Sequence, residues 1–180
     1  MKKNSLVILL SLFLTFPTLG QSIHNLSFTN IDGANVSLNT YAGKKVLFII
    51  APISISDSVK LDELKSFQLR YGDSVAIIGI MSIENGFSSA NSSTIKSMYE
   101  SKGINIVLTG GVYTKKTSGA NQAGFMKWLT EKDDNKRYDV DAKGIWHKFF
   151  VNKEGKLYGF SLPISPLSNN VVSTIVNQGM

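Results

Sequence analysis

Two apolar runs of strand length, separated by a helical pattern, do most to constrain the fold of this chain. Residues 45–51 read KVLFIIA and residues 74–81 read SVAIIGIM. Continuous apolar and β-branched runs of this length are typical of strands that are buried on both faces. Between them, apolar residues recur at three- and four-residue spacing, which predicts a helix that Ser56 or Asp57 can cap and Gly72 can end. The two strands must then run parallel, because a helical crossover returns the chain to the same end of a sheet.

The rest of the chain continues the alternation of strands and helices. The patterns predict a helix after caps at 91–93, a strand at 104–108, a Gly-, Thr- and Ser-rich loop at 109–120 and a helix at about 122–132. They also predict a hairpin of strands 22–29 and 34–38 around the turn at 30–33, and a second hairpin of strands 145–151 and 157–162 around the turn at 152–155. A last helix is predicted to begin at Ser165 and Pro166. This order of elements predicts the α/β class, with a central mixed β-sheet flanked by helices and an N-terminal β-hairpin. The layout resembles the thioredoxin-like fold.

The first twenty residues have the pattern of an export signal. Lys2 and Lys3 precede an apolar run at 6–16, and Pro17 with small neighbours precedes Gln21. A membrane-spanning helix needs about 18 apolar residues or more, so this run is too short to span, and no later stretch approaches that length. We therefore expect residues 1–20 to be a signal peptide, residues 21–180 to form one domain, and the mature protein to be periplasmic or extracellular. A membrane anchor kept through an uncleaved signal is the alternative.

Composition excludes several classes of function. The chain has no cysteine, which rules out disulfides, thiolate metal sites, iron–sulfur clusters and a cysteine nucleophile. Its net charge of +6 falls to +4 without residues 1–20, because that segment holds two lysines and no acidic residue. The lysines between 127 and 148 alternate with aspartates and glutamate, which indicates a solvated mixed surface. Nucleic acid is therefore not expected as a partner.

Two segments of the chain are similar to a known family. Residues 31–51 (IDGANVSLNTYAGKKVLFIIA) resemble the opening of glutathione peroxidases, and residues 148–168 (KFFVNKEGKLYGFSLPISPLS) resemble their closing hairpin and helix start. The Asp-Glu-Leu sequence at 62–64 also lies at the expected distance into the first long helix. The resemblance spans roughly residues 22–176. It implies a thioredoxin-like fold and, as the family's activity, reduction of a hydroperoxide with glutathione or thioredoxin as the thiol partner, with no cofactor.

The family's catalytic positions are all substituted in this sequence. The resemblance places the family's cysteine or selenocysteine at Ser54 and its glutamine at Glu84. The family's tryptophan and asparagine fall on Gly144 and Ile145, and a small shift in register would bring Trp146 to the aromatic position. Peroxide reduction needs a thiolate that attacks one peroxide oxygen and keeps it as a sulfenic acid. A serine hydroxyl cannot do this, so we expect a catalytically inactive binding or scaffold protein.

Three alternatives remain open at this level. One is an active peroxidase-like oxidoreductase with chemistry that the sequence does not reveal. Another is a hydrolase in which His147 activates Ser54, although the Gly-x-Ser-x-Gly elbow is missing and a capping role for the serine is commoner. The third concerns Glu84, which either forms a polar turn with the next two residues or lies in the old cleft with a raised pKa or a bound cation.

The acidic residues between 133 and 141 also suggest calcium, but the EF-hand pattern is missing and a solvated loop is expected instead. We expect neither a metal nor a cofactor.

Overall fold

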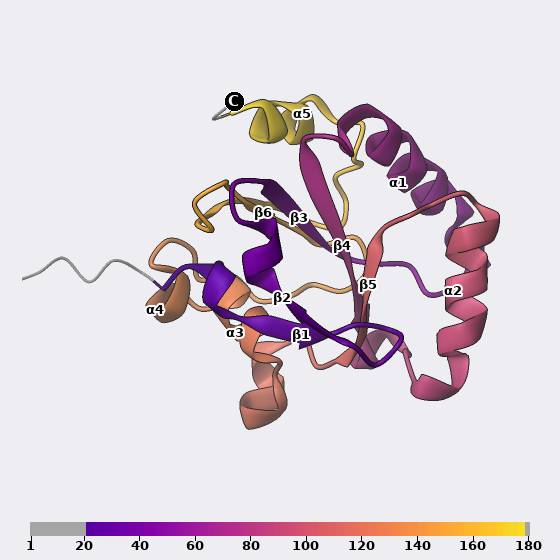
Figure 1. Cartoon of the computed structure of the whole chain (residues 1–180), viewed down its shortest axis with the longest axis horizontal. Helices are drawn as coiled ribbons and strands as arrows, with labels where there is room; N and C mark the ends of the chain where they lie inside the picture. Colours follow the sequence, from indigo (N-terminus) through magenta and orange to yellow (C-terminus); the bar gives the residue numbers. More distant parts are fainter. Residues whose placement is uncertain (1–20, 179–180) are drawn as a thin grey trace, which may run out of the picture.

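Five strands form one mixed sheet in the order β5-β4-β3-β6-β7 (Figure 1). The computed structural model describes residues 21–178, so the expected signal peptide lies outside the described residues. The strands are β3 Lys45–Ile50, β4 Val75–Ser82, β5 Val107–Val112, β6 Lys148–Val151 and β7 Leu157–Ser161. β3, β4 and β5 run parallel, whereas β6 and β7 are antiparallel to their neighbours. The predicted mixed sheet, with two crossovers and a late hairpin, is confirmed.

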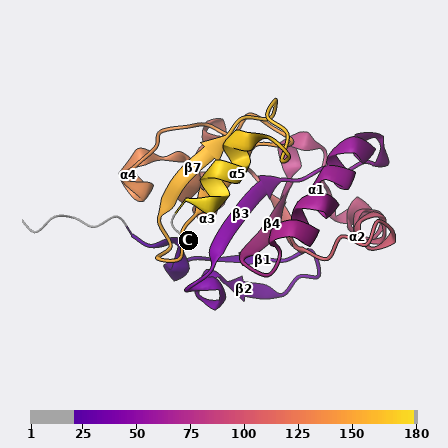
Figure 2. The same ribbon diagram turned by 90° about the horizontal axis from the view of Figure 1, so that it is seen from above.

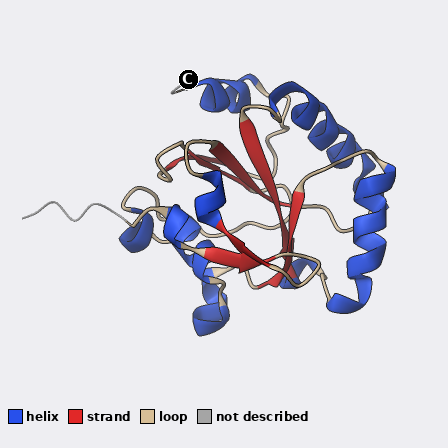
Figure 3. Ribbon diagram, viewed as in Figure 1, coloured by secondary structure: helices blue, strands red, loops and turns tan. Residues whose placement is uncertain are grey.

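Helices cover both faces of this sheet, as expected (Figures 2 and 3). One face packs against α1 (Ser58–Tyr71), α2 (Ser92–Ser101) and α5 (Asn170–Asn177), whose apolar residues share a core with β3 and β4. The other face packs against α3 (Gly124–Thr130), which the short α4 (Lys132–Asn135) follows. We call these two regions the α1-side core and the α3-side core. Because both faces are covered, every residue of β3 is buried, including Lys45, whose Nζ donates to the carbonyl oxygen of Val176 at 2.6 Å.

The N-terminal hairpin is a separate two-stranded sheet beside β5. Its strands are β1 (Ser27–Thr29) and β2 (Asn35–Ser37), which pair antiparallel as predicted. The amide of Ile31 donates to the carbonyl of Leu108 at 3.0 Å, which ties the turn to the edge of the main sheet. The extended segment expected from residue 22 is wrong over Ile23–Asn25, which form a 3-10 turn capped by the Ser22 hydroxyl.

β5 lies further along the chain than the pattern predicts. The expected strand at 104–108 begins only at Val107 and continues through Val112, so the first part of the expected loop is a strand. Its two glycines explain the difference, because a Cβ at Gly111 would lie 2.6 Å from the Phe87 ring, and one at Gly110 would lie 3.2 Å from the Asn30 carbonyl oxygen. These residues are glycines because neighbouring groups pack closely against the strand, and not because the segment is a loop.

Two other boundaries also differ from expectation. β6 begins at Lys148 and not at residue 145, because Trp146 has a φ of 79° and Gly144 a φ of 98°, which are incompatible with an extended strand. α5 begins at Asn170 after the cap Asn169, so the expected helix start at Ser165 and Pro166 is wrong.

Candidate functional site

The topology brings the four substituted positions to one end of the sheet. β3 and β4 end there, and β6 begins there because it is antiparallel to β3. We call this end, with the turns that leave and enter it, the carboxyl end. Two close approaches show that the turns meet: a Cβ on Gly144 would lie 3.5 Å from Asn85 Nδ2, and a Cβ on Gly86 would lie 3.3 Å from Ile53 Cδ1. The turn after β3 therefore contacts the turn after β4, which in turn contacts the segment before β6.

Ser54 is an exposed capping residue in the turn between β3 and α1. It precedes the 3-10 turn Ile55–Asp57, and its Oγ accepts hydrogen bonds from the amide of Ser56 at 3.3 Å and from the Ser56 hydroxyl at 2.9 Å. A serine that accepts from the amide two residues later is a common way to begin a helical turn. The contacts of Ser54 are therefore those of a cap, with no imidazole or carboxylate among its hydrogen-bond partners in residues 21–178.

His147 is fully buried and makes no hydrogen bond with Ser54. Its ring stacks on Phe149 with centroids 4.6 Å apart, and its Nδ1 accepts the amide hydrogen of Lys143 at 3.0 Å. Burial, with the nearby charges of Lys148 and Lys143, lowers the pKa of His147 to about 4. Its buried Nε2 has no hydrogen-bond partner among the described residues. The Ser54–His147 pair considered as a hydrolase dyad is not assembled.

Glu84 holds a distant loop against the end of β4. Its carboxylate accepts hydrogen bonds from five donors, namely the amides of Thr114 and Lys115 and the hydroxyls of Ser82, Thr114 and Ser118. Burial raises the pKa of Glu84, but the bonds from Lys115, Ser82 and Thr114 outweigh it and lower the pKa to about 2. The expected polar turn is confirmed as a 3-10 turn over Ile83–Asn85, whereas the alternative of a raised pKa is wrong.

The segment before β6 carries a strained aromatic residue. Gly144 is buried and Ile145 is half-buried, with its side chain against both cores. Trp146 packs in the α1-side core, and its amide donates to the carbonyl of Ile50 at 2.7 Å. A positive φ is an outlier for so large a residue, and the surrounding packing holds it there. The backbone does turn at this point, but it places the Trp146 ring in the core.

Lys148 is a fully buried lysine that sequence patterns did not predict as part of the site. Its Nζ donates to the carbonyl oxygens of Trp146 at 2.7 Å and Ser165 at 2.6 Å. Burial lowers the pKa of Lys148 to about 8, partly opposed by the charge of Glu63 on α1. The only sequence signal was a lysine that opens the apolar run of β6. The amine ties the segment after β7 to the carboxyl end of the sheet.

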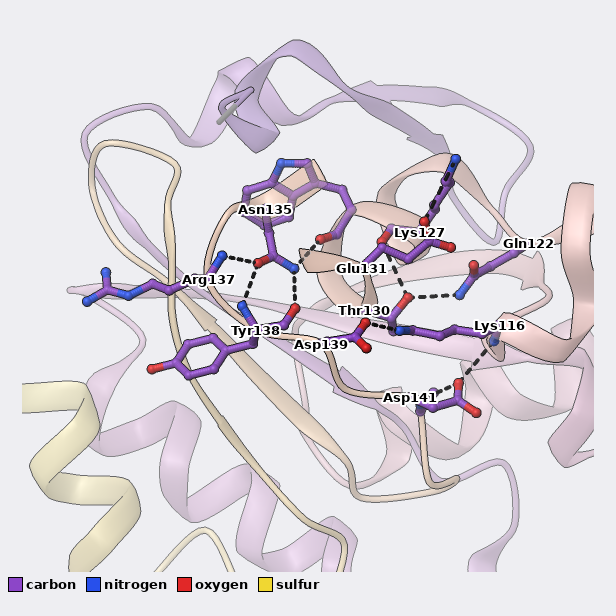
Figure 4. A network of polar contacts seen from close by, with 12 residues as sticks. Lys116, Gln122, Lys127, Thr130, Glu131, Asn135, Arg137, Tyr138, Asp139 and Asp141 are labelled. Carbon is purple, nitrogen blue, oxygen red and sulfur yellow. Dashed lines mark hydrogen bonds and ion pairs between the residues drawn. The ribbon is translucent and has the colours of Figure 1, made fainter. Parts of the chain in front are cut away.

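The acidic segment considered for calcium forms an ion-pair and hydrogen-bond network (Figure 4). Asp139 pairs with the Lys116 amine, and Asp141 Oδ1 accepts from the amides of Lys116 at 3.0 Å and Ala142 at 2.8 Å. No group of three His, Asp or Glu side chains within residues 21–178 is arranged to hold a metal ion. The carboxylates therefore fix the loop at 116 to the segment at 139–142.

Exposed aliphatic side chains lie in two segments at the carboxyl end, one after β3 and one after β7. Ile55 is 59% exposed in the turn after Ser54, and Ile164 is 90% exposed in the segment after β7. Leu162, also exposed, lies between β7 and Ile164. We call these three residues the apolar rim. None of them carries a sequence signal for a site, because an isolated aliphatic residue in a turn has no periodicity. Over the residues described, no helix is both long and apolar enough to cross a membrane.

Solved structures place this fold among known ones, although no family model and no curated protein matches the sequence. The structure named Trgpx superposes with a TM-score of 0.65 at 17% identity, covering 88% of this chain and 97% of the other. GPX1 of T. cruzi gives a TM-score of 0.63 at 10% identity, covering 87% and 95%. A thioredoxin-family thiol:disulfide interchange protein from Chlorobium tepidum gives 0.57 at 15% identity, covering 89% and 99%. The chain therefore has a thioredoxin-like fold, which it shares with glutathione peroxidase-like proteins and thiol–disulfide oxidoreductases.

Proposed function

We propose that this protein is an exported, catalytically inactive homologue of the glutathione peroxidases that binds an apolar polypeptide segment at the carboxyl end of its sheet. One observation carries the proposal. The position that resembles the family's nucleophile holds an exposed serine, at the same end of the sheet as the apolar rim, and not a thiol. A surface of this kind can take up a partner, whereas it cannot accept an oxygen atom from a peroxide.

The surroundings of Ser54 support a role other than catalysis. Glu84 stands where the resemblance places the family's glutamine, whose side-chain amide can donate a hydrogen bond. The Glu84 carboxylate instead accepts hydrogen bonds from Thr114, Lys115 and Ser118. A carboxylate with a pKa of about 2 carries no proton at neutral pH, so it has no hydrogen to donate to a departing oxygen. Gly144 has no side chain to offer, and that of Ile145 is aliphatic. Hydroperoxide, glutathione or thioredoxin would therefore meet a surface without a thiol or these donors.

The apolar rim favours a polypeptide as the bound partner. Burying one isoleucine or leucine side chain contributes roughly 1.5–3 kcal/mol, and Ile164 is almost fully exposed in the free protein. Leu162 and Ile164 alternate with Pro163 in a segment that Lys148 anchors through Ser165. An anchored segment loses little conformational freedom on binding, so more of the burial energy appears as affinity.

The test is binding of a thiol-blocked, unfolded polypeptide, such as a reduced and carboxymethylated protein carrying a fluorophore. Fluorescence anisotropy should show saturable binding to residues 21–180. The variants Leu162→Ser and Ile164→Ser should weaken this binding about tenfold, which corresponds to about 1.4 kcal/mol. Leu69→Ser is the matched control, because Leu69 is 77% exposed in the last turn of α1 and lies away from the carboxyl end. No binding, or equal losses in all three variants, would contradict the proposal.

A further inference from the structure

Helix α1 carries a groove along its outer face. The groove has a volume of about 510 Å³ and runs between α1 and the residues that precede α5. Its lining includes Val59, Asp62, Ser66, Phe67, Arg70 and Leu167. Figures 1 and 2 both show α1 on the outside of the molecule, between α5 and α2. Val59 is 73% exposed at the start of this face, so apolar surface there is left uncovered.

On this face of α1, an acidic and a basic side chain flank one small residue at equal distances. Asp62 precedes Ser66 by four positions and Arg70 follows it by four, so the three side chains lie on one face of the helix. With a rise of about 1.5 Å per residue, the two charges lie about 6 Å on either side of Ser66 along the axis. A two-fold axis at Ser66 would therefore place the acid of one helix opposite the base of an antiparallel copy.

We infer that two copies of this chain associate by antiparallel packing of α1 on α1, with Asp62 of each copy facing Arg70 of the other. A two-fold interface is made of the same patch on both partners, so it must be complementary to itself. A small residue at the centre allows two helices to approach to about 8–10 Å. The groove beside each helix, walled by Phe67 and Leu167, then receives side chains of the second copy.

The contacts that Asp62 and Arg70 make within one chain leave both side chains free to pair with a second copy. Asp62 Oδ1 pairs with Lys102 Nζ at 2.9 Å, yet the Asp62 side chain is 63% exposed, so a second partner can reach it from solvent. The Arg70 guanidinium lies 6.0 Å from the ring centre of its neighbour Tyr71, and no ion pair to Arg70 occurs within residues 21–178. Asp62 and Arg70 lie about 12 Å apart on the helix, too far for a direct pair within one chain. This interface does not involve the apolar rim, so it is independent of the proposed function.

A charge exchange tests this pairing. Sedimentation equilibrium of residues 21–180 should show a reversible dimer, and Asp62→Arg or Arg70→Asp alone should raise its dissociation constant at least about tenfold, because like charges then face each other. The double variant Asp62→Arg with Arg70→Asp should restore the dimer to within about threefold, since the exchanged charges pair again across the axis. Lys65→Glu is the matched control, because it reverses a charge on α1 outside the groove lining.

Each other outcome overturns the inference. A monomer at all accessible concentrations excludes the dimer, and a dimer that neither reversal weakens uses a different surface. A double variant that dissociates as readily as the single ones excludes pairing of α1 with itself. Thermal unfolding followed by circular dichroism establishes that each variant is folded before its mass is measured.

Discussion

The amine of Lys148 lies 5.2 Å from the centre of the Trp146 ring and donates a hydrogen bond to the Trp146 carbonyl oxygen at 2.7 Å. A second bond, to the carbonyl oxygen of Ser165 at 2.6 Å, makes this buried amine a link between the start of β6 and the segment after β7. Trp146 is held at a φ of 79°, so the link fixes a strained part of the backbone. The carboxyl end is therefore shaped by groups below the surface as well as by the residues that it exposes.

The stability of the protein should rise with pH above about 8 because of Lys148. In the folded state its pKa is lowered to about 8 from 10.5, so between these values the unfolded state binds more protons. Stability therefore increases with pH in this window, by up to about 3 kcal/mol for this group, and is unaffected by it below the window. Urea unfolding at pH 7.5, 9 and 10.5 measures the effect. Lys148→Met, whose unbranched side chain is one atom shorter, should lack this gain, and an equal gain in the variant would contradict the assignment.

His147 should destabilise the protein in mild acid. Its folded-state pKa is lowered to about 4 from 6.5, so the unfolded state takes up a proton first as the pH falls. Stability should drop between about pH 6.5 and 4, by up to about 3 kcal/mol for this group. His147→Phe keeps a ring on Phe149 and removes the titration, so its free energy of unfolding should change less across this window. Equal slopes for the two proteins would show that His147 is accessible to protons in the folded state.

Glu84→Gln should weaken the attachment of the loop at 114–118 to β4. The glutamine amide keeps one oxygen, which can still accept from the backbone amides of Thr114 and Lys115. Its NH2 group takes the place of Oε2, so the Ser82 and Thr114 hydroxyls lose their acceptor, and the charge that strengthens all these bonds is removed. The expected loss of stability is about 2–3 kcal/mol. For the unmodified protein, a pKa of about 2 against 4.5 means that the stability Glu84 supplies is lost as the pH falls from about 4.5 to 2. Glu100→Gln, on the exposed side of α2, is the control and should change stability little. Similar losses for both substitutions would contradict this role.

The core of the fold could be predicted from the sequence because its signals are local. The apolar run of β3 and the periodicity of α1 each arise within a few residues, and both elements form where expected. The extension of β5 into the expected loop has a different origin, since Gly111 is accommodated against Phe87, which is distant in sequence. The environment of a candidate site depends on such distant neighbours even more.

The contacts of Glu84 and Lys148 illustrate this limit. The sequence shows a glutamate in a turn, but its low pKa comes from amides about thirty residues later. A lysine at the start of a strand is usually exposed, and only the folded chain reveals the carbonyl oxygen of Ser165 as its acceptor. The resemblance gave positions for the four substituted residues, and their packing could be read only from the fold.

Ser54→Cys tests whether the surroundings of the nucleophile position retain any activating power. Removing one donor that stabilises a developing charge costs about 10²–10³-fold in rate, and the substituted positions lack several. Its thiol should therefore react with hydrogen peroxide within about tenfold of the thiol in Ser88→Cys. Ser88 is the matched control because it is exposed and immediately precedes the 3-10 turn before α2, as Ser54 precedes the one before α1. Stopped-flow thiol oxidation measures both rates, and a reaction more than a hundredfold faster in Ser54→Cys would show that an activating environment survives.

The most direct measurement is peroxide consumption by residues 21–180 without substitutions. Hydrogen peroxide and an organic hydroperoxide are supplied with glutathione and its reductase, or with thioredoxin and its reductase, and the oxidation of NADPH is followed. Because the chain contains no cysteine to form a sulfenic acid, the rate should equal that of the same mixture without the protein. A rate that increases in proportion to the concentration of the protein would contradict the account and show that this fold reduces peroxides by another chemistry.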